Sequence, residues 1–356
     1  MQPLTVDPLQ ERAPVDFIRA ILKRAADAAK ASAGRSLRLG PVATRLHEIS
    51  GGGNDLVDRI LRAAKAPEAG VPAARMTLIV SVGTDSPLGP PPATWPFSID
   101  SRASFQRTVW SPQDGVALTS DEQTGVWNLM DLREHIGLLW IADPRLIPSW
   151  EYGAPLRHHL HWVALQSGAS LVHAAAFLSP GGGILLSGPG GSGKSTTSVA
   201  ALAAGWKILS EDLCWADASG AGITVRCTYS SLKVAAQSRS SFAFVDEIVR
   251  GHAHEEFEKT LVYLDGDVAR TAAERMKGIF CLSGAFASKT TIRPCSKAVA
   301  FQLVAPSTLF LMRTSAMETV SVLRKLIDRL PVFHITLGAD PREAIDVLGR
   351  FAGSLE

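Results

Sequence analysis

The glycine-rich segment at residues 188–195 carries the clearest chemical signal in the chain. Its sequence, GPGGSGKS, fits the pattern G-x-x-x-x-G-K-[ST] without a mismatch. In this pattern the glycines let successive backbone N–H groups turn toward phosphate oxygens, the lysine reaches the β- and γ-phosphates, and the final hydroxyl ligates Mg²⁺. An apolar run precedes the segment and a helical pattern follows it. The segment therefore predicts a site for ATP and Mg²⁺, and a glycine-rich turn without function is the weaker alternative.

The residues expected to bind the nucleotide belong to this loop and to the first turn of the next helix. The start of that helix adds unpaired N–H groups and the positive end of its dipole. Lys194 is expected to act on the transferred phosphate, and Ser195 is expected to bind the metal. The predicted nucleotide-binding residues are Gly188, Gly190, Gly191, Ser192, Gly193, Lys194, Ser195 and Thr196.

Two adjacent carboxylates, Glu211 and Asp212, follow the loop lysine by 17 and 18 residues. They stand at the carboxyl end of the predicted strand WKILS, the edge of an open α/β sheet where ligands bind. One carboxylate can accept a proton from an attacking hydroxyl, while the other holds Mg²⁺ or orients a neighbour. Asp212 is the expected second ligand of Mg²⁺. The structural alternative is a pair of solvated loop acids.

A single histidine, His173, lies within the apolar strand SLVHAAAFL, 21 residues before Lys194. A lone histidine in a strand is more often structural than catalytic. However, a tight turn at 179–183 leads from this strand into the strand before the glycine loop, so one of its faces borders the predicted site. We expect His173 to hydrogen-bond a carboxylate or a phosphate.

The first 150 residues predict an α+β domain without a catalytic signature, with a possible role in substrate recognition. Apolar residues at helical spacing predict a helix over 15–31, with Phe17, Ile18, Ile21, Leu22 and Ala25 on one face. Further predictions are a helix over 54–64 after the glycines at 51–53, a strand over 76–82, and an antiparallel meander over 107–131 with turns at 112–115 and 121–125.

Residues 151–356 predict an α/β domain that positions the chemical residues. A break around 150–155 precedes it. The expected elements are a helix over 156–166, strands over 170–178 and 183–188, a helix over 195–204 that ends at Gly205, and a strand over 206–210.

Composition excludes several classes of protein. The 356 residues have a net charge of +2, which predicts no nucleic-acid or membrane partner. Four widely spaced cysteines predict no disulfide framework, and the N-terminus lacks the pattern of a signal peptide. No apolar run is long enough to cross a membrane. The expected location is the cytoplasm, and the oligomeric state stays open, a homo-oligomer included.

Several weaker signals compete with this interpretation. His158 and His161 share a helical face, but zinc needs three or four converging ligands and no cysteine or acid is near in sequence. Residues 251–256 predict a solvated loop or helix start. Asp265 follows an apolar run as an Mg²⁺-binding aspartate does in other P-loop ATPases, although a strand and an Asp-Gly turn explain it as well. Candidate cations for transition-state charge are Arg226, Lys233, Lys259, Arg275 and Lys277.

The strand LVHAAAF, the loop GPGGSGKST and the acidic pair in LSEDL, at these spacings, resemble the kinase domain of HPr kinase/phosphorylase. That family's P-loop belongs to the branch shared with phosphoenolpyruvate carboxykinase. The similarity continues into YSSLKVAA (229–236), MKGIFCL (276–282) and the tail 331–348, so it covers about residues 155–350. The resemblance implies an α/β P-loop kinase domain of this type, preceded by the smaller α+β domain.

The resemblance also implies ATP-dependent phosphorylation of a serine or threonine hydroxyl on a peptide or small protein. It assigns the base to Glu211, with Asp212 beside it and His173 as a supporting contact. The chain departs from the family in having Glu-Asp instead of Asp-Asp, and in lacking the segment that binds HPr and reverses the reaction. The first half and residues 154–177 look more like the stand-alone relatives encoded with peptide-modifying enzymes, including kinases of lasso-peptide precursors.

Three other functions stay open at this point. A nucleotide switch or ATPase would hydrolyse ATP without an acceptor and would use Asp265 for Mg²⁺. A transferase of another kind would move a different part of the nucleotide, such as AMP, or would use a different phosphoryl donor. A peptide-binding module could keep the fold without binding nucleotide.

Overall fold

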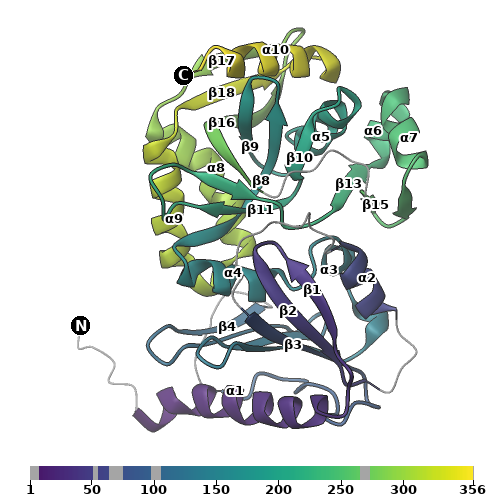
Figure 1. Cartoon of the computed structure of the whole chain (residues 1–356), viewed down its shortest axis with the longest axis vertical. Coiled ribbons are helices and arrows are strands. Elements are labelled where there is room, and N and C mark those ends of the chain that lie inside the picture. Colours follow the sequence, from purple (N-terminus) through teal and green to yellow (C-terminus); the bar gives the residue numbers. More distant parts are fainter. Residues whose placement is uncertain (1–7, 51–54, 64–74, 98–105, 265–272, 356) are drawn as a thin grey trace.

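The computed structural model describes residues 8–50, 55–63, 75–97, 106–264 and 273–355. Within these ranges the chain is a mixed α/β protein with a seven-stranded sheet, an eight-stranded sheet, a three-stranded sheet and ten α-helices. Figure 1 shows the long helix α1 (Pro8–Ala29) along the base, the first sheet above it, and the larger sheet with its flanking helices at the top.

The first sheet has the order β1-β2-β3-β7-β6-β5-β4. The neighbours β2, β3 and β7 run parallel, while the meander from β4 to β7 is antiparallel. The predicted meander is therefore confirmed, and its turns contain Gly115 and Gly125, both with positive φ. The strands are β1 (Arg35–Leu39), β2 (Val42–Glu48), β3 (Arg75–Val82), β4 (Gln106–Ser111), β5 (Val116–Asp121), β6 (Val126–Asp131) and β7 (Ile136–Ile141).

Strands β1 and β2 lie where the sequence predicted no regular structure. Val42, Thr44 and Leu46 are buried and alternate with more exposed neighbours, which is the period-two pattern of a half-buried strand. The pattern covers only seven residues and includes polar ones, so it is too short to predict a strand by itself. Pairing with the distant strand β3 is what establishes β2.

The predicted helices of the first half are present as α1 and α2 (Leu56–Ala63). Helix α1 begins seven residues before the predicted start, and its buried side chains Ile18, Leu22 and Ala25 pack in one cluster with Leu129 of the sheet. The predicted break near 150–155 contains a short helix, α3 (Ser149–Gly153), followed by α4 (Arg157–Gln166).

The larger sheet contains the strands on both sides of the glycine loop. Strand β8 (Ala169–Ser179) lies between β9 (Gly182–Ser187) and β10 (Lys207–Ser210) and runs antiparallel to both. The carboxyl ends of β9 and β10 therefore meet at one edge of the sheet. Strand β9 continues the sheet in parallel with β16 (Ala273–Phe286), which in turn pairs with β18 (Val332–Leu337). The other members are β11 (Leu213–Asp217), β12 (Thr224–Arg226) and β17 (Thr291–Pro294).

Helices cover both faces of this sheet. One buried cluster joins α5 (Lys194–Ala203) and α10 (Pro341–Gly353) to one face, and another joins α8 (Lys297–Leu311) and α9 (Ala316–Arg329) to the other. Figure 1 shows this layered arrangement. A small sheet, β13 (Ser231–Ala235), β15 (Lys259–Tyr263) and β14 (Ala253–Glu255), lies beside α5 with α6 (Ala236–Ser241) and α7 (Ala243–Arg250).

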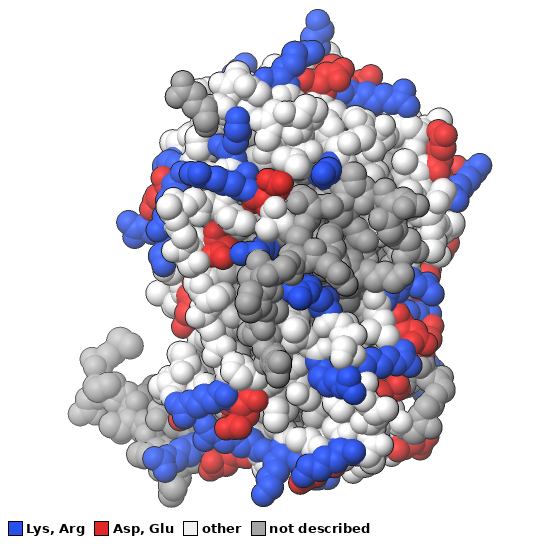
Figure 2. Space-filling view, in the orientation of Figure 1, with Lys and Arg blue, Asp and Glu red and all other residues white. Residues whose placement is uncertain are grey.

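A continuous hydrophobic core links the two halves of the chain. One cluster contains Leu78 of the first sheet, Leu160 of α4, and Leu171 and Trp215 of the larger sheet. In the part of the chain that the structure describes, no helix is long and apolar enough to cross a membrane. Figure 2 shows basic and acidic side chains interspersed over the described residues of one face, in keeping with the small net charge.

Candidate active site

A pocket of about 590 Å³ lies where the carboxyl ends of β9 and β10 meet. Six segments line it: the glycine loop with the first turn of α5, the loop after β10, strands β13 and β15 with α6, the turn from β18 into α10, strand β8 at His173, and the end of β16. Of the predicted site residues, those that line the pocket are His173, Gly190, Gly191, Gly193, Lys194, Ser195, Thr196, Glu211 and Asp212.

The glycine loop leaves open space on its pocket side. A Cβ atom added at Gly190 or Gly191 would meet no atom within 4 Å. Gly193 has a φ of 98°, and its Cβ would lie 2.5 Å from Cδ1 of Leu337. Only glycine fits this last position, because the left-handed backbone and the close neighbour both exclude a side chain. Gly188 and Ser192 do not line the pocket, and the Ser192 hydroxyl is buried without a partner among the described residues.

Lys194 is the first residue of α5 and its side chain curls back under the loop. Its Nζ atom donates hydrogen bonds to the carbonyl oxygens of Gly188 and Pro189, at 2.7 and 3.0 Å. Burial lowers the pKa of the Lys194 ammonium, whereas Glu211 and Asp212 act in the opposite direction. An anionic ligand in the pocket would offset this cost, because it pairs the buried charge.

Glu211 accepts a hydrogen bond from the Ser195 hydroxyl through Oε1. Its second oxygen, Oε2, accepts a hydrogen bond of 3.2 Å from the backbone N–H of Lys233. Burial raises the pKa of Glu211, and the charge of Asp212 raises it further. The structure therefore places Glu211, and not Asp212, beside the Ser195 hydroxyl, which the sequence predicts to bind Mg²⁺.

Asp212 lies between two cationic or potentially cationic groups. Nζ of Lys233 is 2.6 Å from its Oδ2 atom, and Nε2 of His173 is 3.3 Å from its Oδ1 atom. Burial alone favours the neutral form, but Lys233 and His173 outweigh it and hold the pKa of Asp212 well below its usual range. The two neighbouring carboxylates thus differ in environment, which is how paired acids acquire different roles.

His173 reaches Asp212 because of strand register. Strand β8 pairs with β11 so that His173 is opposite Leu213, the residue after Asp212. The backbone of His173 is held on both sides: its N–H donates to Thr308 and its carbonyl accepts from Ser187. The contact of His173 with a carboxylate agrees with the expectation from the sequence.

The structure shows which of the five basic residues predicted to neutralise transition-state charge lie at the pocket. Lys233 and Lys259 line the pocket. The others lie elsewhere: Nζ of Lys277 donates to the carbonyl of Leu355, Arg226 is 4.0 Å from Asp217, and Arg275 packs against Gly222.

The pocket also has an apolar wall that sequence analysis missed. Its residues come from segments as far apart as 242 and 344, so no local motif could reveal it. They are Phe242, Phe286, Ala287, Leu337, Ala339, Pro341 and Ala344. A wall of this kind beside the phosphate loop can accept the flat face of a nucleobase.

The histidines of α4 are structural groups of the core. Nε2 of His161 lies 3.0 Å from the hydroxyls of Ser315 and Thr319, and its Nδ1 accepts from the N–H of Leu171. Residues 251–256, expected to form a solvated loop or helix start, include strand β14. Asp265 lies outside the described residues.

The hydroxyl and carboxylate oxygens of the pocket are suitable ligands for a Mg²⁺ ion that is also bound by phosphates. The described residues contain no group of three or more His, Cys, Asp and Glu that could hold a metal by themselves. Mg²⁺ is usually held by one or two carboxylates together with substrate phosphates and water, so a large protein cage is not required. Ser195 and Glu211 supply adjacent oxygen atoms of this kind.

One pocket thus contains the glycine loop with Lys194, the carboxylates of Glu211 and Asp212, Lys233 and Lys259, and an apolar wall. Such an arrangement can bind a nucleotide and take a proton from a hydroxyl held beside it. No model of a known protein family matches the chain, and no curated protein is significantly similar to it.

Proposed function

We propose that this protein is an ATP-dependent kinase that phosphorylates a serine or threonine hydroxyl of a peptide or small protein. The observation that carries the proposal is the shared pocket of the glycine loop and the His173–Asp212–Lys233 group. Binding of the nucleotide phosphates requires only the glycine loop. A base held beside the phosphate site is the additional part that transfer to a hydroxyl requires.

In this proposal the loop amides, Lys194 and the first turn of α5 bind the phosphates of ATP. The Ser195 hydroxyl and the Glu211 carboxylate would hold Mg²⁺, which supplies positive charge to the phosphate oxygens when bound. The apolar wall that includes Phe242 and Leu337 would accept the adenine ring. This assignment exchanges the roles of the two acids that the family resemblance implies.

Asp212 is the proposed base. The acceptor oxygen forms a bond to the γ-phosphorus, the bond from this phosphorus to the β–γ bridging oxygen breaks, and ADP leaves. The hydroxyl proton passes to Asp212, whose ionised state Lys233 and His173 support. Lys233 and Lys259 are placed to face the charge that develops on the transferred group.

We infer a domain of HPr-kinase type over residues 151–356 from the sequence resemblance. In this chain the histidine strand, the strand before the glycine loop and the acidic pair, which carry that resemblance, meet at one edge of a mixed sheet. Residues 1–150 would then form a recognition domain, and a precursor peptide of a modification pathway is the proposed kind of acceptor.

Labelled ATP and a library of serine- and threonine-containing peptides test this function. We expect Mg²⁺-dependent transfer of the γ-phosphate to peptide, confirmed as a single phosphate by mass spectrometry. Lys194→Ala should reduce the rate by at least about 10²-fold, whereas Lys207→Ala, which changes an exposed lysine of β10, should not. Release of phosphate without a labelled peptide would contradict the kinase and favour a nucleotide switch, and an adenylated peptide would indicate nucleotidyl transfer.

A further inference from the structure

A second pocket adjoins the phosphate site and shares two residues with it. Its volume is about 270 Å³, and Lys233 and Lys259 line both pockets. Its other walls are Ser149 and Trp150 of α3, the loop before β15 at Phe257 and Glu258, and Leu261. The function proposed above assigns no role to this pocket.

The two pockets are connected by one surface strip of the small sheet, formed by Lys233, Ala235, Lys259 and Leu261. In the register of β13 and β15, Lys233 is opposite Leu261 and Ala235 is opposite Lys259. Because side chains alternate along a strand, these four residues share one face. Leu261 lines the second pocket and Ala235 lines the first, so an extended chain that lies on the strip passes from one pocket into the other.

Contacts between α3 and the small sheet shape the second pocket. The Ser231 hydroxyl donates to the carbonyl of Gly153, and a Cβ at Gly153 would lie 2.7 Å from Cε of Lys233. The rings of Tyr152 and Phe257 stack with centroids 5.6 Å apart, and the guanidinium of Arg59 lies 4.4 Å from the Tyr152 centroid. The walls are therefore formed before any ligand arrives.

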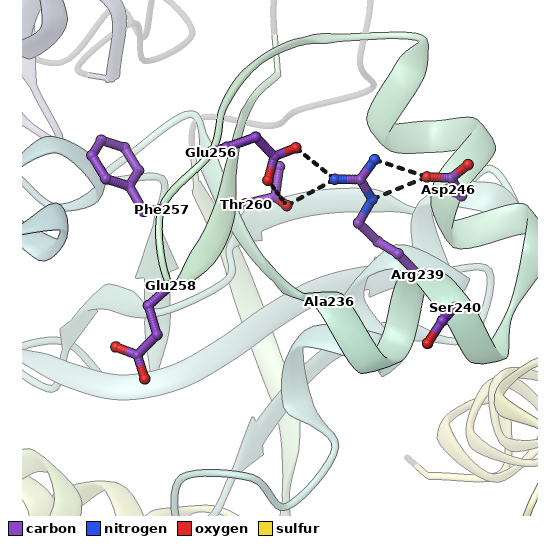
Figure 3. A pocket seen from close by; sticks show the side chains of 8 residues that line it. All are labelled: Ala236, Arg239, Ser240, Asp246, Glu256, Phe257, Glu258 and Thr260. Carbon is purple, nitrogen blue, oxygen red and sulfur yellow. Dashed lines mark hydrogen bonds and ion pairs between the residues drawn. The ribbon is translucent and has the colours of Figure 1, made fainter.

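Arg239 anchors the loop that carries Phe257. Its guanidinium pairs with Asp246 and, through Nη1, with Glu256 at 2.6 Å. Figure 3 is drawn around a neighbouring pocket that this loop also lines, and it shows Glu256 pointing toward Arg239, while the side chains of Phe257 and Glu258 point away from Arg239. The ion pairs thus hold the loop from one side, and its other side presents Phe257 to the second pocket.

Trp150 is the large aromatic residue that remains exposed at this pocket, with 44% of its surface accessible. Tryptophan is enriched at binding interfaces, because it combines a large apolar ring with a polar N–H group. The pocket volume is below the roughly 300–1,000 Å³ of small-molecule sites, so it suits one or two side chains of a longer ligand. Lys233 and Lys259 outweigh the one acid that lines the pocket, Glu258, and the resulting positive charge disfavours a basic side chain there.

We infer that the second pocket binds the acceptor peptide. An aliphatic or aromatic side chain next to the accepting serine or threonine inserts between Trp150 and Phe257. The peptide backbone then follows the strip over Lys233, which brings the hydroxyl to Asp212. This inference rests on the proposed kinase function and adds the class of acceptor: a peptide with an apolar, non-basic neighbour of the hydroxyl.

A positional-scanning peptide library with labelled ATP tests the inference. The wild-type protein should prefer an apolar residue next to the hydroxyl. Trp150→Ala should weaken this preference and raise the KM for the best peptide by roughly fivefold, the effect of losing one aromatic contact. The KM for ATP should stay the same. Trp150→Phe should keep the preference, and Leu146→Ala, which removes an exposed apolar side chain outside the pocket, should behave as wild type.

The outcomes separate the two proposals. If peptide is phosphorylated but Trp150→Ala, folded as judged by its melting temperature, keeps the wild-type KM and preference, the acceptor pocket is wrong and the kinase function stands. A wild-type preference for basic neighbours also overturns the inference. If ATP raises the melting temperature of the wild type but no library peptide accepts label, the kinase function fails and the inference with it.

Discussion

Nζ of Lys233 lies 2.6 Å from Oδ2 of Asp212, and this ion pair connects the proposed base to the strand that links the two pockets. His173 contacts the other oxygen of the same carboxylate. Both oxygens of Asp212 therefore have a donor, and the carboxylate is held ionised in a half-buried position. Lys233 also contributes its backbone N–H to Glu211, so one residue positions both acids.

Replacing Lys233 should shift the pH dependence of the reaction. Lys233→Met removes the ammonium that lowers the pKa of Asp212, so that pKa should rise. Asp212 can accept a proton only when it is ionised, and the acid limb of kcat/KM against pH should therefore move to higher pH. Lys233→Arg should restore much of the wild-type profile. An unchanged acid limb in Lys233→Met would show that Asp212 is not the base.

Substitutions of Asp212 and of Glu211 should impair the reaction in different ways. Asp212→Asn should lower kcat by about 10²- to 10⁴-fold, the usual contribution of a general base, without raising the Mg²⁺ concentration that the reaction needs. Glu211→Gln should raise that Mg²⁺ requirement, because Glu211 contacts Ser195. Steady-state kinetics over a Mg²⁺ titration measures both effects. The reverse pattern would support the roles that the family resemblance implies, with Glu211 as the base.

Gly193 and Gly190 offer a matched pair in the glycine loop. Gly193→Ala should lower the free energy of unfolding by about 1–3 kcal/mol, because the backbone is left-handed there and Leu337 leaves no room. Gly190→Ala should change it by less than about 0.5 kcal/mol, since open space surrounds this position. Urea unfolding measures both variants. Equal effects would mean that the loop differs from the described conformation.

The buried histidines of α4 should make the protein sensitive to acid. Burial lowers the pKa of His159 to about 4 and that of His161 to about 3, from 6.5. Between these values and 6.5 the unfolded chain binds protons that the folded protein does not, so stability is full above pH 6.5 and is lost as the pH falls. His159 alone contributes about 3 kcal/mol to this loss.

Urea unfolding at near-neutral and mildly acidic pH measures the effect. His159→Gln keeps a donor for the carbonyl oxygens of Leu129 and Leu138 but does not titrate, so its stability should fall less steeply with acid. His254→Gln, which changes an exposed histidine, should follow the wild type. A wild-type stability that does not change between the two pH values would contradict the described burial of α4.

Local patterns in the sequence predicted the elements that carry the loop. The strand before residue 188, the helix that ends at Gly205, and the meander of the first sheet all depend on short-range periodicity or on turn residues. The position of His173 beside the glycine loop was also predictable, because a tight hairpin leads from its strand into the strand before the loop. These features need no knowledge of distant contacts.

Other features of the site depend on pairings between distant segments. Strand register decides which acid meets Ser195 and which meets Lys233, because neighbouring side chains at a strand end point in different directions. The same holds for the choice of Lys233 and Lys259 among five basic candidates, and for the apolar wall assembled around Leu337. The sequence by itself determined that a glycine-rich loop with a phosphate-binding pattern lies between a strand and a helix. The tertiary structure alone decided which side chains face it, since their positions result from strand pairing and packing across more than a hundred residues.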